Sequence, residues 1–144
     1  MDPKRVLIVA YKTAATQALA DAVRERAAQG PAAFSLLVPA PISGLQKILD
    51  PEDASDDEGR QVLELALPVL EAAAGGPVEG IVGDPNPMNA VQDAINLQGY
   101  DEIILSTLPA RVSRWLRLDL PSKIAGLGLP VTTVTARERA PSET

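Results

Sequence analysis

The sequence predicts a three-layer α/β/α sandwich built on one five-stranded parallel sheet. Five short apolar runs rich in β-branched residues recur along the 144 residues, and segments with apolar residues at helical spacing separate them. Proline and glycine fall at the boundaries between these segments. Because strands that alternate with helices are joined by right-handed crossovers, we expect a doubly wound sheet with strand order 3-2-1-4-5.

The first apolar run is continuous rather than alternating, which is typical of a parallel strand covered on both faces. The first run is VLIVA, and the last, VTTVT, follows Pro130 and is β-branched at every position. The predicted strands are residues 6–10, 34–38, 78–82, 103–105 and Val131–Thr135.

The helices predicted between the strands span residues 14 to about 28, about 57 to 74, 87 to 97, and about 112 to 125. Thr13 and Asn86 are candidate caps of the first and third helices, because their side-chain oxygens accept hydrogen bonds from exposed N–H groups of a first turn. Pro68 and Pro121 lie inside the second and fourth patterns, where proline removes a helical hydrogen bond. We therefore expect a kink or a break at Pro68 and an interruption near Pro121.

Histidine and cysteine are absent from the sequence, which restricts the chemistry of any site. Their absence excludes Ser-His-Asp and Cys-His nucleophiles, zinc sites built from His or Cys, and disulfides. Aromatic residues make up only 3% of the chain, so the core must consist of valine, isoleucine, leucine and alanine. We assign no catalytic residue and no metal ligand.

The net charge of −6 comes from 13 basic and 19 acidic residues, and this balance disfavours binding to the phosphate backbone of nucleic acids. Charges of opposite sign occupy different stretches. Residues 50–102 hold thirteen acids and one base, Arg60, whereas residues 106–125 hold four bases and one acid, Asp119. We expect the acidic stretch to form a solvated face.

The chain length fits one domain, because domains cluster near about 100–150 residues. We expect residues 1–136 to form that domain and residues 137–144, RERAPSET, to form a disordered polar tail. No apolar run reaches the roughly 18–20 residues of a membrane span, and the first run is shorter than the about 7–15 residues of a secretory segment. We therefore expect a cytoplasmic protein with no membrane or nucleic-acid partner.

The candidate ligand site lies where the strand order reverses, because open parallel sheets bind ligands there, beyond the carboxyl ends of the strands. With the expected order, this point lies between the first and fourth strands. Hydroxyl groups, cationic side chains and helix N-termini at this point suit a phosphate or a carboxylate. The candidate binding residues are Tyr11, Lys12, Thr13, Asp84, Ser106, Thr107, Arg111, Ser113 and Arg114.

Several of these features have a second interpretation. The hydroxyl residues Thr13, Ser106 and Ser113 could be helix caps, and the arginines could form surface ion pairs with the acidic stretch. Trp115, with three leucines that follow it, could be an exposed interaction patch or the buried face of the fourth helix.

Four segments of the sequence resemble the universal stress protein family, and the similarity spans residues 4–135. The segments are VLIVAYKTAATQAL, VEGIVGDPNPMNAVQDAI, DEIILST and LPVTTV. Members that bind nucleotides carry G-x2-G-x9-G-[ST] after the fourth strand, where Thr107, Ala110 and Leu120 stand in place of the three glycines, and the aspartate usual after the first strand is Tyr11 here. The resemblance also implies a homodimer formed through the last strand, Val131–Thr135.

These observations favour a non-catalytic module that binds a small anionic ligand or a protein partner in a stress response. No cofactor is assigned, and ATP or AMP is the nucleotide that the resemblance would suggest. One alternative is a nucleotide-binding or nucleotide-hydrolysing enzyme on the same scaffold. Another is an interaction scaffold whose crevice is filled by side chains.

Overall fold

The computed structural model describes residues 3–39, 56–109 and 113–135, and every structural statement below concerns these residues. Five strands form one parallel sheet in the order β3-β2-β1-β4-β5, which confirms the predicted fold class and strand order. The strands are β1 Lys4–Val9, β2 Ala32–Pro39, β3 Val78–Gly83, β4 Glu102–Thr107 and β5 Val131–Thr135. Each predicted strand agrees with its observed counterpart within two residues at either end. The tail expected at residues 137–144 lies outside the described residues.

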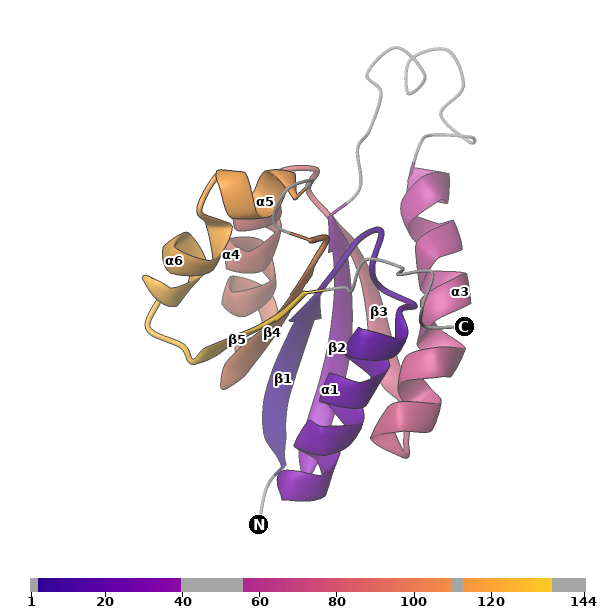
Figure 1. Cartoon of the computed structure of the whole chain (residues 1–144). Coiled ribbons are helices and arrows are strands. Elements are labelled where there is room, and N and C mark those ends of the chain that lie inside the picture. The colour runs from indigo at the N-terminus through magenta and orange to yellow at the C-terminus, as the bar shows by residue number, and fades with distance from the viewer. Residues whose placement is uncertain (1–2, 40–55, 110–112, 136–144) are drawn as a thin grey trace.

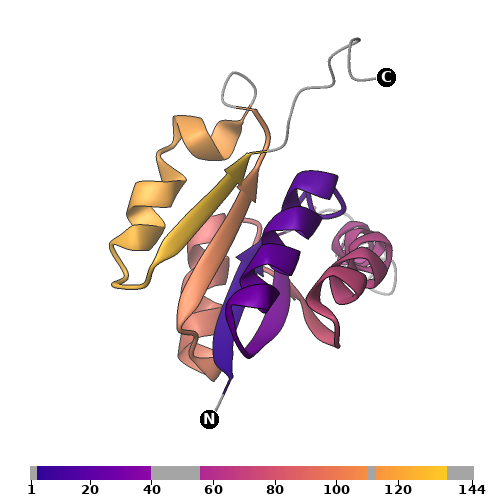
Figure 2. The same cartoon turned by 60° about the horizontal axis from the view of Figure 1, so that its bottom comes forward.

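Helices cover both faces of the sheet. The helices are α1 Gln17–Gln29, α3 Asp56–Ala74, α4 Pro87–Gln98, α5 Arg114–Arg117 and α6 Leu120–Ala125. Figure 1 shows α1 and α3 on one face and α4, α5 and α6 on the other, and Figure 2 shows the same layers from below. The molecule therefore has a separate hydrophobic core on each side of the sheet.

The central strand β1 contributes to both cores through alternate side chains. Val6 and Ile8 pack beneath α1 and α3, whereas Leu7 and Val9 pack beneath the opposite helices, and all four are fully buried. Burying a side chain of this size stabilises the fold by about 1.5–3 kcal/mol relative to leaving it exposed. Burial on both faces is the physical reason that this strand is apolar without alternation.

Helix α1 begins three residues later than predicted, and its cap is Thr16 rather than Thr13. The Thr16 hydroxyl accepts a hydrogen bond from the Leu19 backbone N–H at 3.4 Å. A turn precedes it, in which the Thr16 N–H donates to the Thr13 carbonyl at 3.1 Å. Thr13 is thereby left out of the helix, and its buried side chain bonds across the sheet to β4 instead.

The break expected at Pro68 is not found, whereas the interruption expected near Pro121 is confirmed. Helix α3 runs through Pro68 to Ala74, so this proline does not end it. Pro68 and Glu64 are both exposed, which lets the carbonyl that loses its partner be hydrated. The predicted fourth helix is two helices, separated at Asp119, whose backbone is left-handed with φ of 58°. Pro121 lies in the first turn of α6, where proline fits, so the interruption falls just before it.

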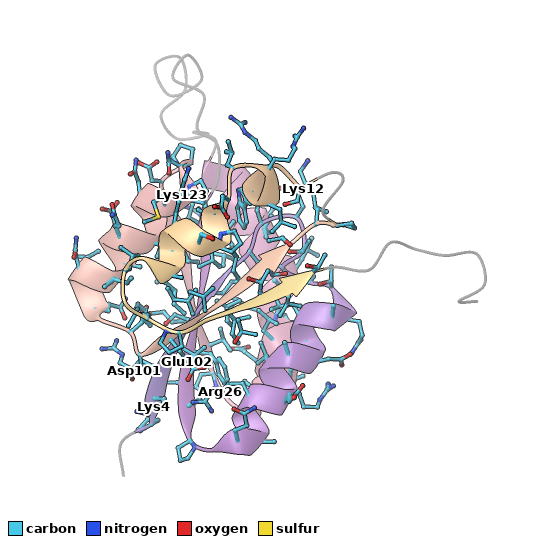
Figure 3. The ribbon with its side chains drawn as sticks, turned by 60° about the vertical axis from the view of Figure 1, so that its left-hand side comes forward. Lys4, Lys12, Arg26, Asp101, Glu102 and Lys123 are labelled. Atoms are coloured by element: carbon cyan, nitrogen blue, oxygen red, sulfur yellow. The ribbon has the colours of Figure 1, made fainter. Side chains whose placement is uncertain are left out.

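An ion pair fixes α1 to the start of β4 at the end of the sheet opposite the carboxyl ends of the strands. The Arg26 Nε lies 3.0 Å from both carboxylate oxygens of Glu102, and its Nη2 lies 3.0 Å from Oε1. Figure 3 shows these two side chains together, far from Lys12 at the other end of the molecule.

Replacing Asn86 by alanine is expected to lower the free energy of unfolding by about 0.5–2 kcal/mol, because Asn86 is the confirmed cap of α4. Its Oδ1 accepts hydrogen bonds from the N–H groups of Met88 at 2.9 Å and Asn89 at 3.2 Å. Urea denaturation measures the loss. The control is Asn96→Ala, an exposed position near the end of the same helix, and an equal loss in both variants would contradict the capping role.

Candidate functional site

A cavity of about 360 Å³ opens beyond the carboxyl ends of β1 and β4, at the expected switch point of the sheet. The residues that follow β1 form one wall, and the end of β4 with the start of α5 forms the other. The lining residues are Tyr11, Lys12, Thr13, Pro39, Pro85, Ser106, Thr107, Leu108, Ser113, Arg114 and Trp115. We call this the switch-point cavity. Seven of the nine candidate binding residues are therefore brought together in one place.

Buried hydroxyl groups dominate the polar part of the lining. Thr13, Ser106, Thr107 and Ser113 are each buried, and only one other serine or threonine among the described residues, Ser35, is buried as well. The Thr13 and Ser106 hydroxyls lie 2.6 Å apart and share a hydrogen bond, which joins residues 93 positions apart in the sequence. Hydroxyl groups both donate and accept, so this wall can present donors to a ligand oxygen without carrying charge.

Thr107 has a hydroxyl group that the described part of the chain leaves without a hydrogen-bond partner. Its side chain is 1% exposed, and its Oγ1 is buried. An unmade hydrogen bond at a buried group costs about 1–3 kcal/mol, so such groups are rare in folded proteins. Because Thr107 lines the cavity, a bound molecule could supply the missing partner.

Ser113 caps the short helix α5, as its second interpretation anticipated. Its hydroxyl oxygen accepts a hydrogen bond from the Leu116 N–H at 3.1 Å. The hydroxyl proton is not used in that bond, since the oxygen acts as the acceptor. A capping role and a place in the cavity wall are therefore compatible for this residue.

Cationic and aromatic side chains complete the cavity. Lys12 and Arg114 are exposed and stand at its rim, whereas Tyr11 and Trp115 are half-buried in its walls. These two are half of the four aromatic residues in the chain. Trp115 also packs against the core beneath α4 and α6, which confirms the interpretation of its helix as a buried face. Leu118, in contrast, is 52% exposed.

Two candidate binding residues are not among the described residues that line the cavity. Asp84 lies in a neighbouring groove between β3 and α4, where its Oδ1 accepts a hydrogen bond from the Asn86 N–H at 2.8 Å. Arg111 lies outside the described residues. The candidate binding residues did not include Trp115, Pro39, Pro85 or Leu108, and the only signal of the last three was their position shortly after a predicted strand.

Two features that would point to other classes of site are not found within residues 3–39, 56–109 and 113–135. No group of three or more acidic side chains is placed to hold a metal ion. No helix is both long enough and apolar enough to cross a membrane.

Comparison with known proteins identifies the fold. No protein-family model matches the sequence, and a search of characterised proteins finds no match. Among solved structures, a universal stress protein in complex with cAMP superposes with a TM-score of 0.58 at 15% identity, over 96% of this chain and 100% of that chain. The chain therefore has the fold of a universal stress protein.

Proposed function

We propose that the protein is a non-catalytic module of the universal stress protein type that binds a small anionic ligand in the switch-point cavity. The observation that carries this proposal is the buried Thr107 hydroxyl, which lines the cavity and lacks a partner among the described residues. The hydroxyls of Thr13 and Ser106 lie in the same wall, and Lys12 and Arg114 supply positive charge at the rim. The cavity volume is near the lower end of the roughly 300–1,000 Å³ typical of ligand pockets.

The comparison structure suggests a first ligand to test, because it is a complex with cAMP. A cyclic nucleotide carries one negative charge and a planar ring system. The half-buried rings of Tyr11 and Trp115 offer surfaces on which such a ring can stack. Neutral hydroxyl donors with two peripheral cations suit one negative charge better than the several charges of a polyphosphate.

Cyclic AMP at 1 mM is expected to raise the melting temperature of the protein. A ligand at 100 times its Kd stabilises by about 2.7 kcal/mol, which corresponds to about 5–11 °C for a domain near 150 residues. Differential scanning fluorimetry measures the shift. Thr107→Val, which removes the hydroxyl and keeps the shape, should abolish most of it, whereas Ser122→Ala, an exposed hydroxyl on α6 outside the cavity, should not. An equal shift in both variants would remove the support for this site.

ATP at millimolar concentration, with or without magnesium, is expected to leave the melting temperature within about 1–2 °C of its starting value. The nucleotide-binding glycines are replaced here, and the described lining of the cavity contains no carboxylate to share a magnesium ion. A large magnesium-dependent shift would favour the nucleotide-hydrolysing alternative. Native mass spectrometry of the purified protein would identify any ligand that remains bound.

We also propose a homodimer that forms through β5. Within the described part of the chain this strand pairs with β4 alone, and Thr132 and Thr133 are exposed on it. An open strand edge presents unpaired backbone groups that a second copy can satisfy. The fold likeness supports a role in a stress response.

Sedimentation velocity at micromolar concentration is expected to show a dimer that Thr133→Pro converts to a monomer. Because this proline could also disturb the pairing of β4 with β5, Thr133→Glu provides a second variant, which places like charges on both copies. Circular dichroism checks that each variant is folded. A monomeric parent protein, or a dimer that persists in both folded variants, would refute the interface.

A further inference from the structure

A second groove, of about 480 Å³, runs between β3 and α4 and belongs to neither the switch-point cavity nor the β5 edge. Pro85 is the only described residue that lines both the groove and the cavity. The groove is lined by Leu37, Ile81, Val82, Gly83, Asp84, Pro85, Ala90, Asp93, Ala94, Leu97 and Gln98. We call it the acidic groove, because Asp84 and Asp93 line it.

Apolar side chains form most of the groove, and one of them is strongly exposed. Leu97 on α4 is 83% exposed, the largest exposed fraction among the large hydrophobic residues described. Ile81 on β3 is only half-buried, although its neighbour across the strand pair, Leu37, is fully buried. An apolar surface that remains open between a strand and a helix can hold a side chain of a partner.

The strand that borders the groove has an unpaired edge. Among the described strands, β3 is the first in the sheet order and pairs only with β2, beside which Figure 1 shows it. Gly80 in the middle of β3 is exposed, and because glycine has no side chain, the exposed atoms belong to the backbone. An extended segment could therefore add to this edge as a sixth strand and form hydrogen bonds with it.

The charged residues around the groove are acidic. Asp84 and Asp93 line it, and neither lysine nor arginine is among its described lining residues. Glu79 projects from β3 on the same face as Ile81, since side chains two positions apart share a face, and its Oε1 accepts a hydrogen bond from the Ser35 hydroxyl at 3.3 Å. Two copies paired through these edges would bring acidic groups together, which is unfavourable. A basic partner would instead be complementary.

We propose that the acidic groove binds an extended segment of another protein, which adds to β3 as a strand. One aliphatic side chain of that segment would contact Leu97 and Ile81. Lysine or arginine two positions before and after it would face Asp84, Asp93 and Glu79. Acidic residues between positions 50 and 102 would then bind a partner, in addition to forming a solvated face.

The probe is a pentapeptide with the sequence Ac-Lys-Thr-Leu-Thr-Lys-amide, labelled with rhodamine. In an extended conformation it presents both lysines and the leucine on one face. Fluorescence anisotropy at low salt should show binding that weakens as salt increases. A peptide with glutamate in place of both lysines, and a peptide with N-methylated threonines, which cannot donate those backbone hydrogen bonds, should each bind at least tenfold more weakly.

Variants of the full chain locate the site. Leu97→Ala should weaken binding about fivefold or more, and the double variant Asp84→Asn with Asp93→Asn should weaken it about three- to tenfold and reduce its dependence on salt. The controls are Leu65→Ala on α3, which removes a leucine that is 71% exposed on the other face, and Glu25→Gln on α1, also exposed. Both should bind as the parent protein does.

Nuclear magnetic resonance provides an independent readout. The peptide should shift the backbone amide signals of Gly80, Ile81 and Leu97 and leave those of Ser106 and Thr107 unchanged. The proposal is overturned if the peptide does not bind at millimolar concentration, if the glutamate or N-methylated peptide binds equally well, or if the shifts fall elsewhere. Self-association of the chain that Leu97→Ala abolishes would also overturn it, because a second copy would then occupy the groove.

Discussion

Gly83→Ala is expected to lower the free energy of unfolding by about 1–3 kcal/mol, a large effect for a single added methyl group. A Cβ at Gly83 would lie 2.8 Å from the Leu37 Cδ1 and 3.0 Å from the Ala90 Cβ. Leu37 and Ala90 are both almost completely buried, so neither can move aside without disturbing the core between the sheet and α4. Glycine is therefore required here for close packing of β3 on the helix that follows it.

The effect should appear as a fall in melting temperature of about 2–12 °C, using about 2–4 °C per kcal/mol for a domain near 150 residues. Gly76→Ala is the matched control, because a Cβ at Gly76 would meet nothing within 4 Å. This control should change stability by no more than about 0.5 kcal/mol. A similar loss in both variants would contradict the role of the contact with Leu37 and Ala90, because an alanine without close contacts reduces the entropy of the unfolded chain and does not itself destabilise the fold.

Ser106→Ala is expected to destabilise the protein by about 1–3 kcal/mol, because it leaves the buried Thr13 hydroxyl without its partner at 2.6 Å. Thr13→Val removes the other hydroxyl and should have a similar effect. The exposed Ser122→Ala on α6 should cost no more than about 0.5 kcal/mol.

The double variant, Thr13→Val with Ser106→Ala, should be clearly more stable than the sum of the two single losses predicts. Removing both hydroxyls leaves no unpaired polar group of this pair, and we expect a coupling energy of about 1 kcal/mol or more. Urea denaturation of the four proteins, without added ligand, completes the cycle. Additive losses would show that the two hydroxyls do not depend on each other.

Strands β1 and β4 could be predicted from the sequence because they are buried on both faces and are therefore continuous apolar runs. Strands β3 and β5 are partly exposed, and their signal was β-branched residues next to proline and glycine boundaries. The cap of α4 was also predictable, since Asn86 and Pro87 form a local signal that needs no distant contact. The start of α1 was not, because Thr13 and Thr16 are both suitable caps. The Ser106 hydroxyl on β4 distinguishes them, because it forms a hydrogen bond with the Thr13 side chain.

The position of the cavity could be predicted because strand order alone decides where a doubly wound sheet reverses. Its lining could be predicted only in part. Asp84 follows the end of β3, which is two places from β1 in the sheet, so at about 4.8 Å per strand it is about 10 Å from β1. Trp115 enters the lining through the turn that begins α5, whose boundaries differ from the predicted helix.

The sequence by itself determined the fold class and the absence of histidine and cysteine chemistry, because periodicity and composition are properties of the chain alone. The expected strand order was established by the pairing of the strands. Only the tertiary structure decided which polar groups meet. It paired Thr13 with Ser106, left the Thr107 hydroxyl buried without a partner among the described residues, and exposed Leu97 beside the open edge of β3. These features depend on contacts between residues far apart in the sequence, and no local pattern specifies such contacts.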